Sequence, residues 1–304
     1  MSFQLRPDES ITHGLRRLAR KQLEVARGEL GRTRPLRDEP VHEARKCVKK
    51  VRAILQLIDD DGRGVQRSEK RLRSINRILS DLRDADVMME TLAGLRVRHP
   101  HVLNERAFAR ARRRLSVRKR DAARAVGRAN TWKAVDRKLR TVRRDAKGWH
   151  PDHHGVGVLM RGLRSAHRRG RDAMKQAEQK PRAENFHAWR KEIKALWYAM
   201  RLVERSDPSV RRDIRALNRA ETLLGDDHNL VVLCEELSSD ITVCRDPVDV
   251  DRLRLAADRD QCHLREQAIN RVRYMFRRRS GAFARDVARA WKKWRDERLR
   301  NRRP

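Results

Sequence analysis

Apolar residues recur at steps of three and four along almost the whole chain, which is the spacing of amphipathic helices. The breaks in this pattern coincide with turn-forming segments such as DDGRG at 60–64 and WHPDHHG at 149–155. No segment shows the strict alternation of a half-buried strand, so we predict an all-α protein. The pattern predicts helices at residues 9–30, 41–58, 66–96, 101–126, 131–146, 156–178, 184–205, 208–224, 227–239, 248–277 and 281–301.

Two segments of the chain repeat at the same distance. A shift of 145 residues places VHEARKCVKKVRAILQLI (41–58) on FHAWRKEIKALWYAMRLV (186–203). The same shift, without a gap, places LSDLRDADVMMETL (79–92) on LGDDHNLVVLCEEL (224–237). Because both motifs keep one spacing, we predict an internal duplication with halves 1–148 and 155–304 and a linker near 149–154. We expect one helical bundle from each half.

The first motif in each half combines an apolar seam with a stripe of basic residues. The stripe lies roughly 130° around the helix from the seam. Two interpretations are open, a solvated face and a binding surface. The lysines and arginines of the stripe have no acid at i±4, and we expect Glu43 and Glu192 to point elsewhere. Like charges at this spacing destabilise a helix, so their presence in both copies favours an anionic ligand. The stripe residues are His42, Arg45, Lys46, Lys49 and Arg52, and then His187, Arg190, Lys191 and Lys194.

The histidines of the stripe have two plausible roles. Neither His42 nor His187 has a second ligand at i+3 or i+4, which argues against a metal site. Each is either a hydrogen-bond donor to phosphate or a partly buried structural residue, and a phosphate-bound histidine would tend to stay protonated. In the second motif Arg83 and His228 occupy matching places, and Asp84 either orients a basic neighbour or caps a turn. Further candidates for the basic surface, or for ordinary surface charge, are Arg16, Arg20, Arg161, Arg164 and Arg168.

The charge of the chain narrows the choice of partner. The 304 residues carry 76 Lys and Arg against 42 Asp and Glu, a formal net charge of +34. Such a chain attracts polyanions, namely DNA, RNA, an anionic membrane face or a polyphosphate. A genomic bias toward arginine would explain Arg over Lys but not the excess over acids. The four cysteines form no CxxC pair, and no apolar run reaches ~18 residues, so we expect a cytoplasmic protein without structural zinc or a membrane span.

The pattern H-x-x-R-K-x-x-K followed by L-x-x-L-R-D-x-D-V, repeated in the second half, resembles the CHAD domain (conserved histidine α-helical domain) from about residue 10 to 295. The resemblance implies two four-helix bundles related by pseudo-two-fold symmetry around a basic central cavity. It also implies non-catalytic binding of inorganic polyphosphate, often at cytoplasmic polyphosphate granules. The ligand-facing set implied by the resemblance is His42, Arg45, Lys46, Lys49, Arg52, Arg83, His187, Arg190, Lys191, Lys194 and His228.

Two departures from the family pattern predict that the second half binds the anion less completely than the first. Trp197 stands where the family usually has arginine, and Asn229 replaces the usual acid. We therefore expect imperfect symmetry between the halves.

Two other functions stay open from the sequence. Non-specific DNA or RNA binding is the main alternative, although the chain has only six Trp, two Tyr and five Phe for base stacking. Several of these lie in core registers, and the remaining options are Trp132, Trp149, Trp291 and Trp294. An enzyme is the third class, but the chain has no E-x-E, G-x-x-x-x-G-K or G-x-S-x-G motif. The histidines at 150, 153 and 154 are interpreted as a solvated linker and not as a metal site. The prediction is a non-enzymatic polyphosphate binder without a cofactor.

Overall fold

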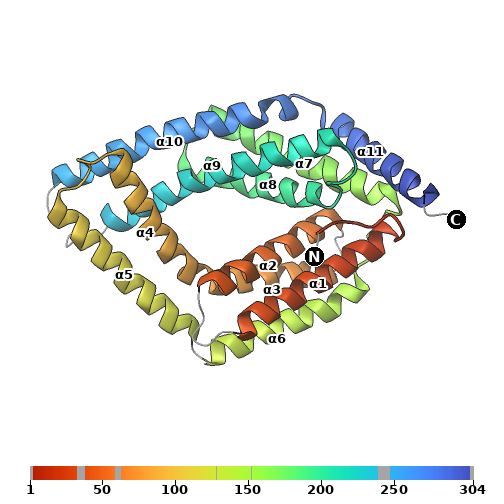
Figure 1. The fold of residues 1–304 in the computed structure, drawn as a ribbon, viewed down its shortest axis with the longest axis horizontal. Coiled ribbons are helices and arrows are strands. Elements are labelled where there is room, and N and C mark those ends of the chain that lie inside the picture. The colour runs from red at the N-terminus through yellow and green to blue at the C-terminus, as the bar shows by residue number, and fades with distance from the viewer. Residues whose placement is uncertain are drawn as a thin grey trace.

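The computed structural model describes residues 3–32, 38–58, 63–127, 129–151, 153–238 and 247–301, and their regular secondary structure is entirely helical (Figure 1). This confirms the predicted all-α class. The helices are α1 (Ile11–Arg32), α2 (Asp38–Ile58), α3 (Arg63–Ile78), α4 (Ser80–Arg98), α5 (Glu105–Gly127), α6 (Ala129–Asp145), the 3₁₀ turn η1 (Ala146–Gly148), α7 (Val156–Gln179), α8 (Ala183–Arg201), α9 (Pro208–Ser238), α10 (Pro247–Phe276) and α11 (Ser280–Arg300).

The order of helices repeats along the chain. Helices α7, α8 and α9 begin 145 residues after α1, α2 and α3, which is the shift that aligns the sequence motifs. In the first half, α1 packs against α2 and α6, while α3 packs against α2 and α6. In the second half, α7 packs against α8 and α11, and α9 packs against α8 and α10. Each half therefore supplies a bundle, and the origin of the halves by duplication stays a prediction.

The two bundles share one hydrophobic core. A single cluster of buried apolar residues includes Val48 and Leu55 of α2 together with Leu163 of α7 and Trp189 of α8. Helices α2 and α7 approach closely at Gly162, where a side chain would not fit. A Cβ added there would lie 2.5 Å from the carbonyl oxygen of Leu57. The predicted linker is thus not a seam between separate cores.

A second hydrophobic cluster joins the far ends of the two halves. It contains Leu92 of α4, Leu115 of α5, Leu233 of α9 and Leu253 of α10. These helix ends lie on the left in Figure 1, away from the N-terminus and α11. The halves are consequently held together at two places, once between α2 and the pair α7 and α8, and once through α4 and α9. No helix among the described residues has the length and apolar composition to cross a membrane.

Two predictions of helix continuity are wrong. The segment predicted as one helix at 66–96 is divided at Leu79 into α3 and α4, and the break predicted near 225 is absent because α9 is continuous. Gly225 stays in helical conformation, and its missing side chain leaves room for Arg190, whose Nη2 lies 3.1 Å from where a Cβ would be. Here the glycine marks a close contact and not a helix end.

The linker between the halves is packed and not simply solvated. Trp149 is buried, and its carbonyl oxygen accepts a 2.7 Å hydrogen bond from Arg16 Nε on α1. Gly155 then enters α7 with φ of 55°, a conformation that favours glycine. The fixed linker holds the start of the second half against α1.

One buried polar group lies inside the second bundle. His167 of α7 stacks on Phe283, with ring centroids 4.3 Å apart, and its Nε2 lies 3.1 Å from the carbonyl oxygen of Met275. Its Nδ1 lies 2.9 Å from Ser280 Oγ, so a neutral imidazole donates from Nε2 and accepts at Nδ1. Burial lowers the pKa of His167 to about 4, so His167 is neutral at pH 7.

Candidate anion-binding site

The basic stripes of α2 and α8 meet where these two helices pack together. Lys49 of α2 lies close enough to Lys194 and Arg190 of α8, and to Arg45 of its own helix, for their charges to affect its titration. Burial, and then these three cations, lower the pKa of Lys49 to about 7. The structure thus brings together four predicted site residues from two segments 145 residues apart. We call Arg45, Lys49, Arg190 and Lys194 the cationic cluster.

An acid that the sequence did not single out sits against the cationic cluster. Glu221 of α9 forms ion pairs with Lys194 and, at 3.2 Å, with Arg190 Nη2, and it is only 8% exposed. Burial alone would raise the pKa of Glu221, but Lys194 and Arg190 lower it below its ordinary value. Glu221 therefore acts as an internal counter-ion. The position 145 residues earlier is Asn76, which carries no charge.

The cluster arginines connect the two motifs of each half. Arg45 Nη1 donates a 3.3 Å hydrogen bond to the carbonyl oxygen of Ser80, at the start of α4. The guanidinium of Arg190 lies against Gly225 in α9. Ser80 and Gly225 are 145 residues apart, so each arginine contacts the corresponding position of the second motif. These contacts give a physical reason for the constant sequence spacing between the two motifs of each half.

The second-half histidines form a ring pair. The centroids of His187 and His228 are 4.1 Å apart, with the ring planes inclined at 36°. Burial, then His228, Lys191 and Arg190 lower the pKa of His187 to about 4. His187 is therefore neutral at pH 7 without ligand, whereas the sequence argument expected a protonated histidine once phosphate is bound. His187 Nδ1 is buried and has no hydrogen-bond partner among the described residues. His42, its counterpart on α2, is half-buried.

Arg52 belongs to an ion pair outside the cationic cluster. Its Nε and Nη2 donate to the carboxylate of Glu69 on α3 at 3.0 and 2.8 Å. The positions 145 residues later are Trp197 and Ile214, so both members of the pair are replaced together. The tryptophan at 197 thus marks the loss of a contact between helices as well as the loss of a basic residue.

Lys46 and Lys191 occupy the outer part of the stripe. Lys46 forms a 2.6 Å ion pair with Glu43 at i−3, so the expectation that Glu43 points away from the stripe is wrong. The i,i+3 spacing places both side chains on one face. Glu192 does point elsewhere, to Arg169 at 2.9 Å. Lys191 is exposed to solvent.

The additional basic candidates divide into anchored and exposed residues. Arg16 anchors the linker through Trp149, and Arg20 Nε is buried without a hydrogen-bond partner among the described groups. Three arginines of α7 are exposed, namely Arg161, Arg164 and Arg168. The side chains of Arg83 and Asp84 lie outside the described residues, so their predicted roles stay predictions.

The linker histidines make polar contacts with protein groups. His150 Nδ1 lies 2.7 Å from the carbonyl oxygen of Gly148, and His153 Nε2 lies 2.6 Å from Arg161 Nη1. Within the described ranges, no three His, Cys, Asp or Glu side chains are grouped so that they could hold a metal ion. The interpretation of these histidines as a solvated linker stays a prediction, while Trp149 beside them is buried.

The fold and the paired motifs define an all-helical domain in which one basic helix from each half meets the other. The family model of the CHAD domain matches residues 16–238, and the chain belongs to the CHAD domain family. The crystal structure of the CHAD domain from the plant Ricinus communis aligns with a TM-score of 0.60 at 16% sequence identity. The alignment covers 86% of this chain and 89% of that chain, and at this identity it shows the fold. No curated protein matches the sequence.

Proposed function

We propose that this CHAD domain binds inorganic polyphosphate, without chemical conversion, at the cationic cluster where α2 and α8 meet. The observation that carries the proposal is the gathering of Arg45, Lys49, Arg190 and Lys194, where burial and then the neighbouring cations lower the pKa of Lys49 to about 7. Cations held this close repel each other, and a chain of phosphates would relieve that repulsion through charge-assisted hydrogen bonds. The basic central cavity and association with cytoplasmic polyphosphate granules, both implied by the family resemblance, are part of this proposal.

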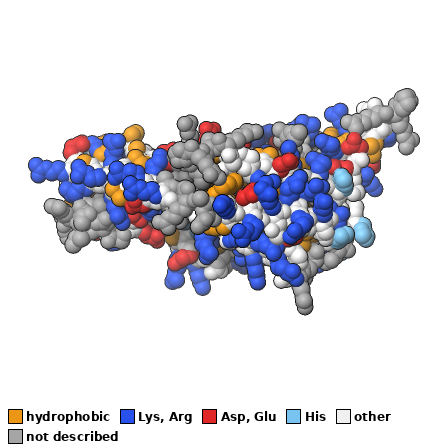
Figure 2. Space-filling view, turned by 90° about the horizontal axis from the view of Figure 1, so that it is seen from below, with side chains coloured by type: hydrophobic (Ala, Val, Ile, Leu, Met, Phe, Trp, Pro, Cys, Tyr) orange, Lys and Arg blue, Asp and Glu red, His pale blue; other side chains and the backbone are white. Residues whose placement is uncertain are grey.

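The aromatic residues favour polyphosphate over single-stranded nucleic acid. Of the tryptophans available for base stacking, Trp149 and Trp291 are buried, and Trp132 and Trp294 are partly buried against the core. Single-strand binders commonly present exposed rings on which bases stack. Figure 2 shows that Lys and Arg side chains predominate over Asp and Glu among the described residues of one face, which supports attraction to any polyanion. Non-specific nucleic-acid binding is therefore the second candidate.

The acids near the cationic cluster favour binding over hydrolysis. Metal-assisted phosphoryl transfer requires clustered carboxylates with oxygen atoms available for the ions. Glu221 is already engaged by Arg190 and Lys194, and Asp227 of the second motif is engaged by Arg265 at 2.6 Å. These side chains hold arginine and lysine in place. The proposed role of the site is recognition.

The proposal is tested by replacing the four residues of the cationic cluster with alanine. Charge-assisted contacts contribute roughly 1.5–3 kcal/mol each, so we expect affinity for long-chain polyphosphate to fall about 100-fold or more at ~0.15 M salt. The matched control replaces two arginines and two lysines that are exposed on α11, namely Arg285, Arg289, Lys292 and Lys293. Equal loss of affinity in both variants, with unchanged circular dichroism, would show that only total charge matters.

A further inference from the structure

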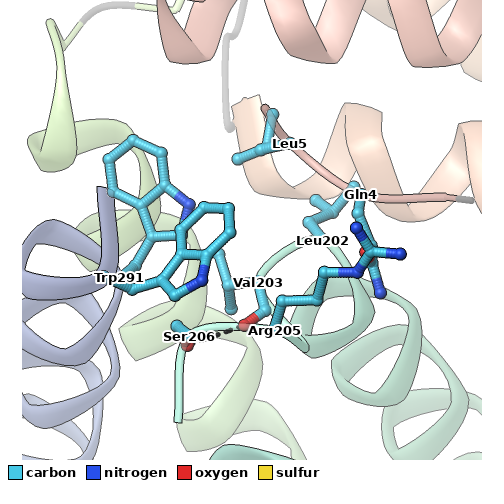
Figure 3. A pocket seen from close by; sticks show the side chains of 8 residues that line it. Gln4, Leu5, Leu202, Val203, Arg205, Ser206 and Trp291 are labelled. Carbon is cyan, nitrogen blue, oxygen red and sulfur yellow. Dashed lines mark hydrogen bonds between the residues drawn. The ribbon is translucent and has the colours of Figure 1, made fainter. Parts of the chain in front are cut away.

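A groove away from the cationic cluster has the features of a second ligand site. It has a volume of 560 Å³ and lies where the N-terminal segment crosses between α1, the end of α8 and α11. The segment is fixed by a 2.9 Å hydrogen bond from Leu5 N to the carbonyl oxygen of Leu202, and by another from Arg295 Nε to that of Pro7. Figure 3 shows an adjoining recess, with Gln4 and Leu5 on one side and Trp291 on the other.

The charges that line the groove favour an anion. Asp8 is the acidic member of the lining, and Arg17 is neutralised by Glu9, whose carboxylate lies 2.6 Å from Arg17 Nη2. Lys21 contacts only the exposed Glu24, at 3.5 Å, among the described acids. The remaining positive charge attracts a compact anionic group. The basic residues of the lining are Arg6, Arg17, Lys21, Arg205 and Arg298.

Two glutamines that line the groove have amide oxygens enclosed by the protein. Gln22 of α1 is 8% exposed, and its Oε1 has no hydrogen-bond partner among the described groups. Gln4 Oε1 is also buried and unpartnered, while Gln4 Nε2 donates to Glu204 at 3.2 Å. Buried acceptors without a donor are unfavourable. Because these oxygens are enclosed, an ordered water can satisfy them, and a ligand in the groove contacts the basic side chains and Trp294 instead.

The groove also contains an aromatic surface of suitable size. Trp294 of α11 is partly buried against the core and lines the groove. An indole ring can stack on a nucleobase, and sites for small molecules commonly have volumes of about 300–1,000 Å³. We propose that the groove binds a nucleoside phosphate, with the base against Trp294. The phosphates lie toward Arg205 and Arg298.

The test uses isothermal titration calorimetry with ATP, inorganic triphosphate and adenosine at ~0.15 M salt. It is done on the four-alanine variant of the cationic cluster, because the intact cluster would itself bind triphosphate and so obscure the groove. We expect one ATP to bind per chain of this variant, about tenfold more tightly than triphosphate or adenosine, because each probe lacks one half of the contacts. Loss of ATP binding in that variant would overturn the proposal.

Two single substitutions locate the binding. Arg298→Ala should weaken ATP about tenfold, whereas the matched control Arg300→Ala, an exposed arginine of the same helix outside the groove lining, should leave it unchanged. Trp294→Leu should reduce the preference for ATP over triphosphate, because the stacking surface for the base is removed. Triphosphate binding as tightly as ATP, or equal effects of the two arginine variants, would refute a nucleoside phosphate site.

Discussion

Replacing Glu221 with glutamine tests whether this acid competes with the bound anion. In the unliganded domain Glu221 is paired with Arg190 and Lys194, both of which belong to the cationic cluster. Glutamine keeps the size and polarity of the side chain but removes its charge. The substitution also makes the position neutral, as Asn76 is at the corresponding place in the first half. Two effects of opposite sign follow from this change.

The first effect is tighter binding. At an effective dielectric constant of about 20 and a separation of about 7 Å, one unit charge changes the energy of a bound phosphate by about 2.4 kcal/mol. Salt and solvent at this partly open site reduce that value, so we expect a gain of about tenfold in polyphosphate affinity. The second effect is a less stable unliganded fold, by about 2–3 kcal/mol, because buried cations lose their partner.

The two effects are measured by calorimetric titration with polyphosphate and by chemical denaturation without ligand. The matched control is Glu192→Gln, an acid of α8 that pairs with Arg169 and not with the cationic cluster. We expect the control to change affinity less than about twofold. If Glu221→Gln weakens polyphosphate binding or leaves it unchanged, Glu221 positions the cations for the ligand and does not compete with it.

Four further outcomes are expected. Lys49 has a pKa of about 7, and its protonation adds charge to the cationic cluster, so polyphosphate affinity should rise about threefold to tenfold from pH 8 to pH 6. A calorimetric affinity that does not change with pH would contradict this. The lowered pKa of Lys49 also makes the unfolding free energy of the unliganded domain rise between pH 7 and pH 10.5, because the unfolded chain binds more protons in that interval. His167 has a pKa of about 4 in the folded state against 6.5 in the unfolded chain, so the unfolding free energy should fall by about 3 kcal/mol as pH falls from 6.5 to 4. Denaturation curves of His167→Gln should lack this pH dependence. Arg52→Ala should lower the unfolding free energy by about 1–2 kcal/mol because the ion pair with Glu69 is lost, and it should change polyphosphate affinity less than about twofold. A loss of polyphosphate affinity as large as that caused by Lys49→Ala would instead show that Arg52 binds the ligand.

The helical fold was predictable because its signal is local. The spacing of three and four along α2 and α8 specifies both the helices and their buried faces, and the structure buries the predicted seams. The continuity of α9 was not predictable, because Gly225 usually indicates a helix end and its contact with Arg190 exists only in three dimensions. For the same reason, the shared core of the two bundles was missed, since it depends on how α2 approaches α7.

The candidate site was only partly predictable. The repeated basic stripe led to Arg45, Lys49, Arg190 and Lys194, which the structure brings together. Glu221 was missed because it lies on another helix, although a signal was available. It occurs among the apolar positions of α9, where a charged residue is rarely buried without a partner.

The most direct measurement for the central claim is a competition between polyphosphate and single-stranded DNA. The domain is first saturated with labelled single-stranded DNA at ~0.15 M salt, and long-chain polyphosphate or unlabelled DNA is then added at equal concentrations of phosphate. If the cationic cluster recognises closely spaced phosphates, polyphosphate should displace the label at a concentration about tenfold or more below that of DNA. Displacement at equal concentrations would contradict the account and leave a basic helical surface without preference for polyphosphate.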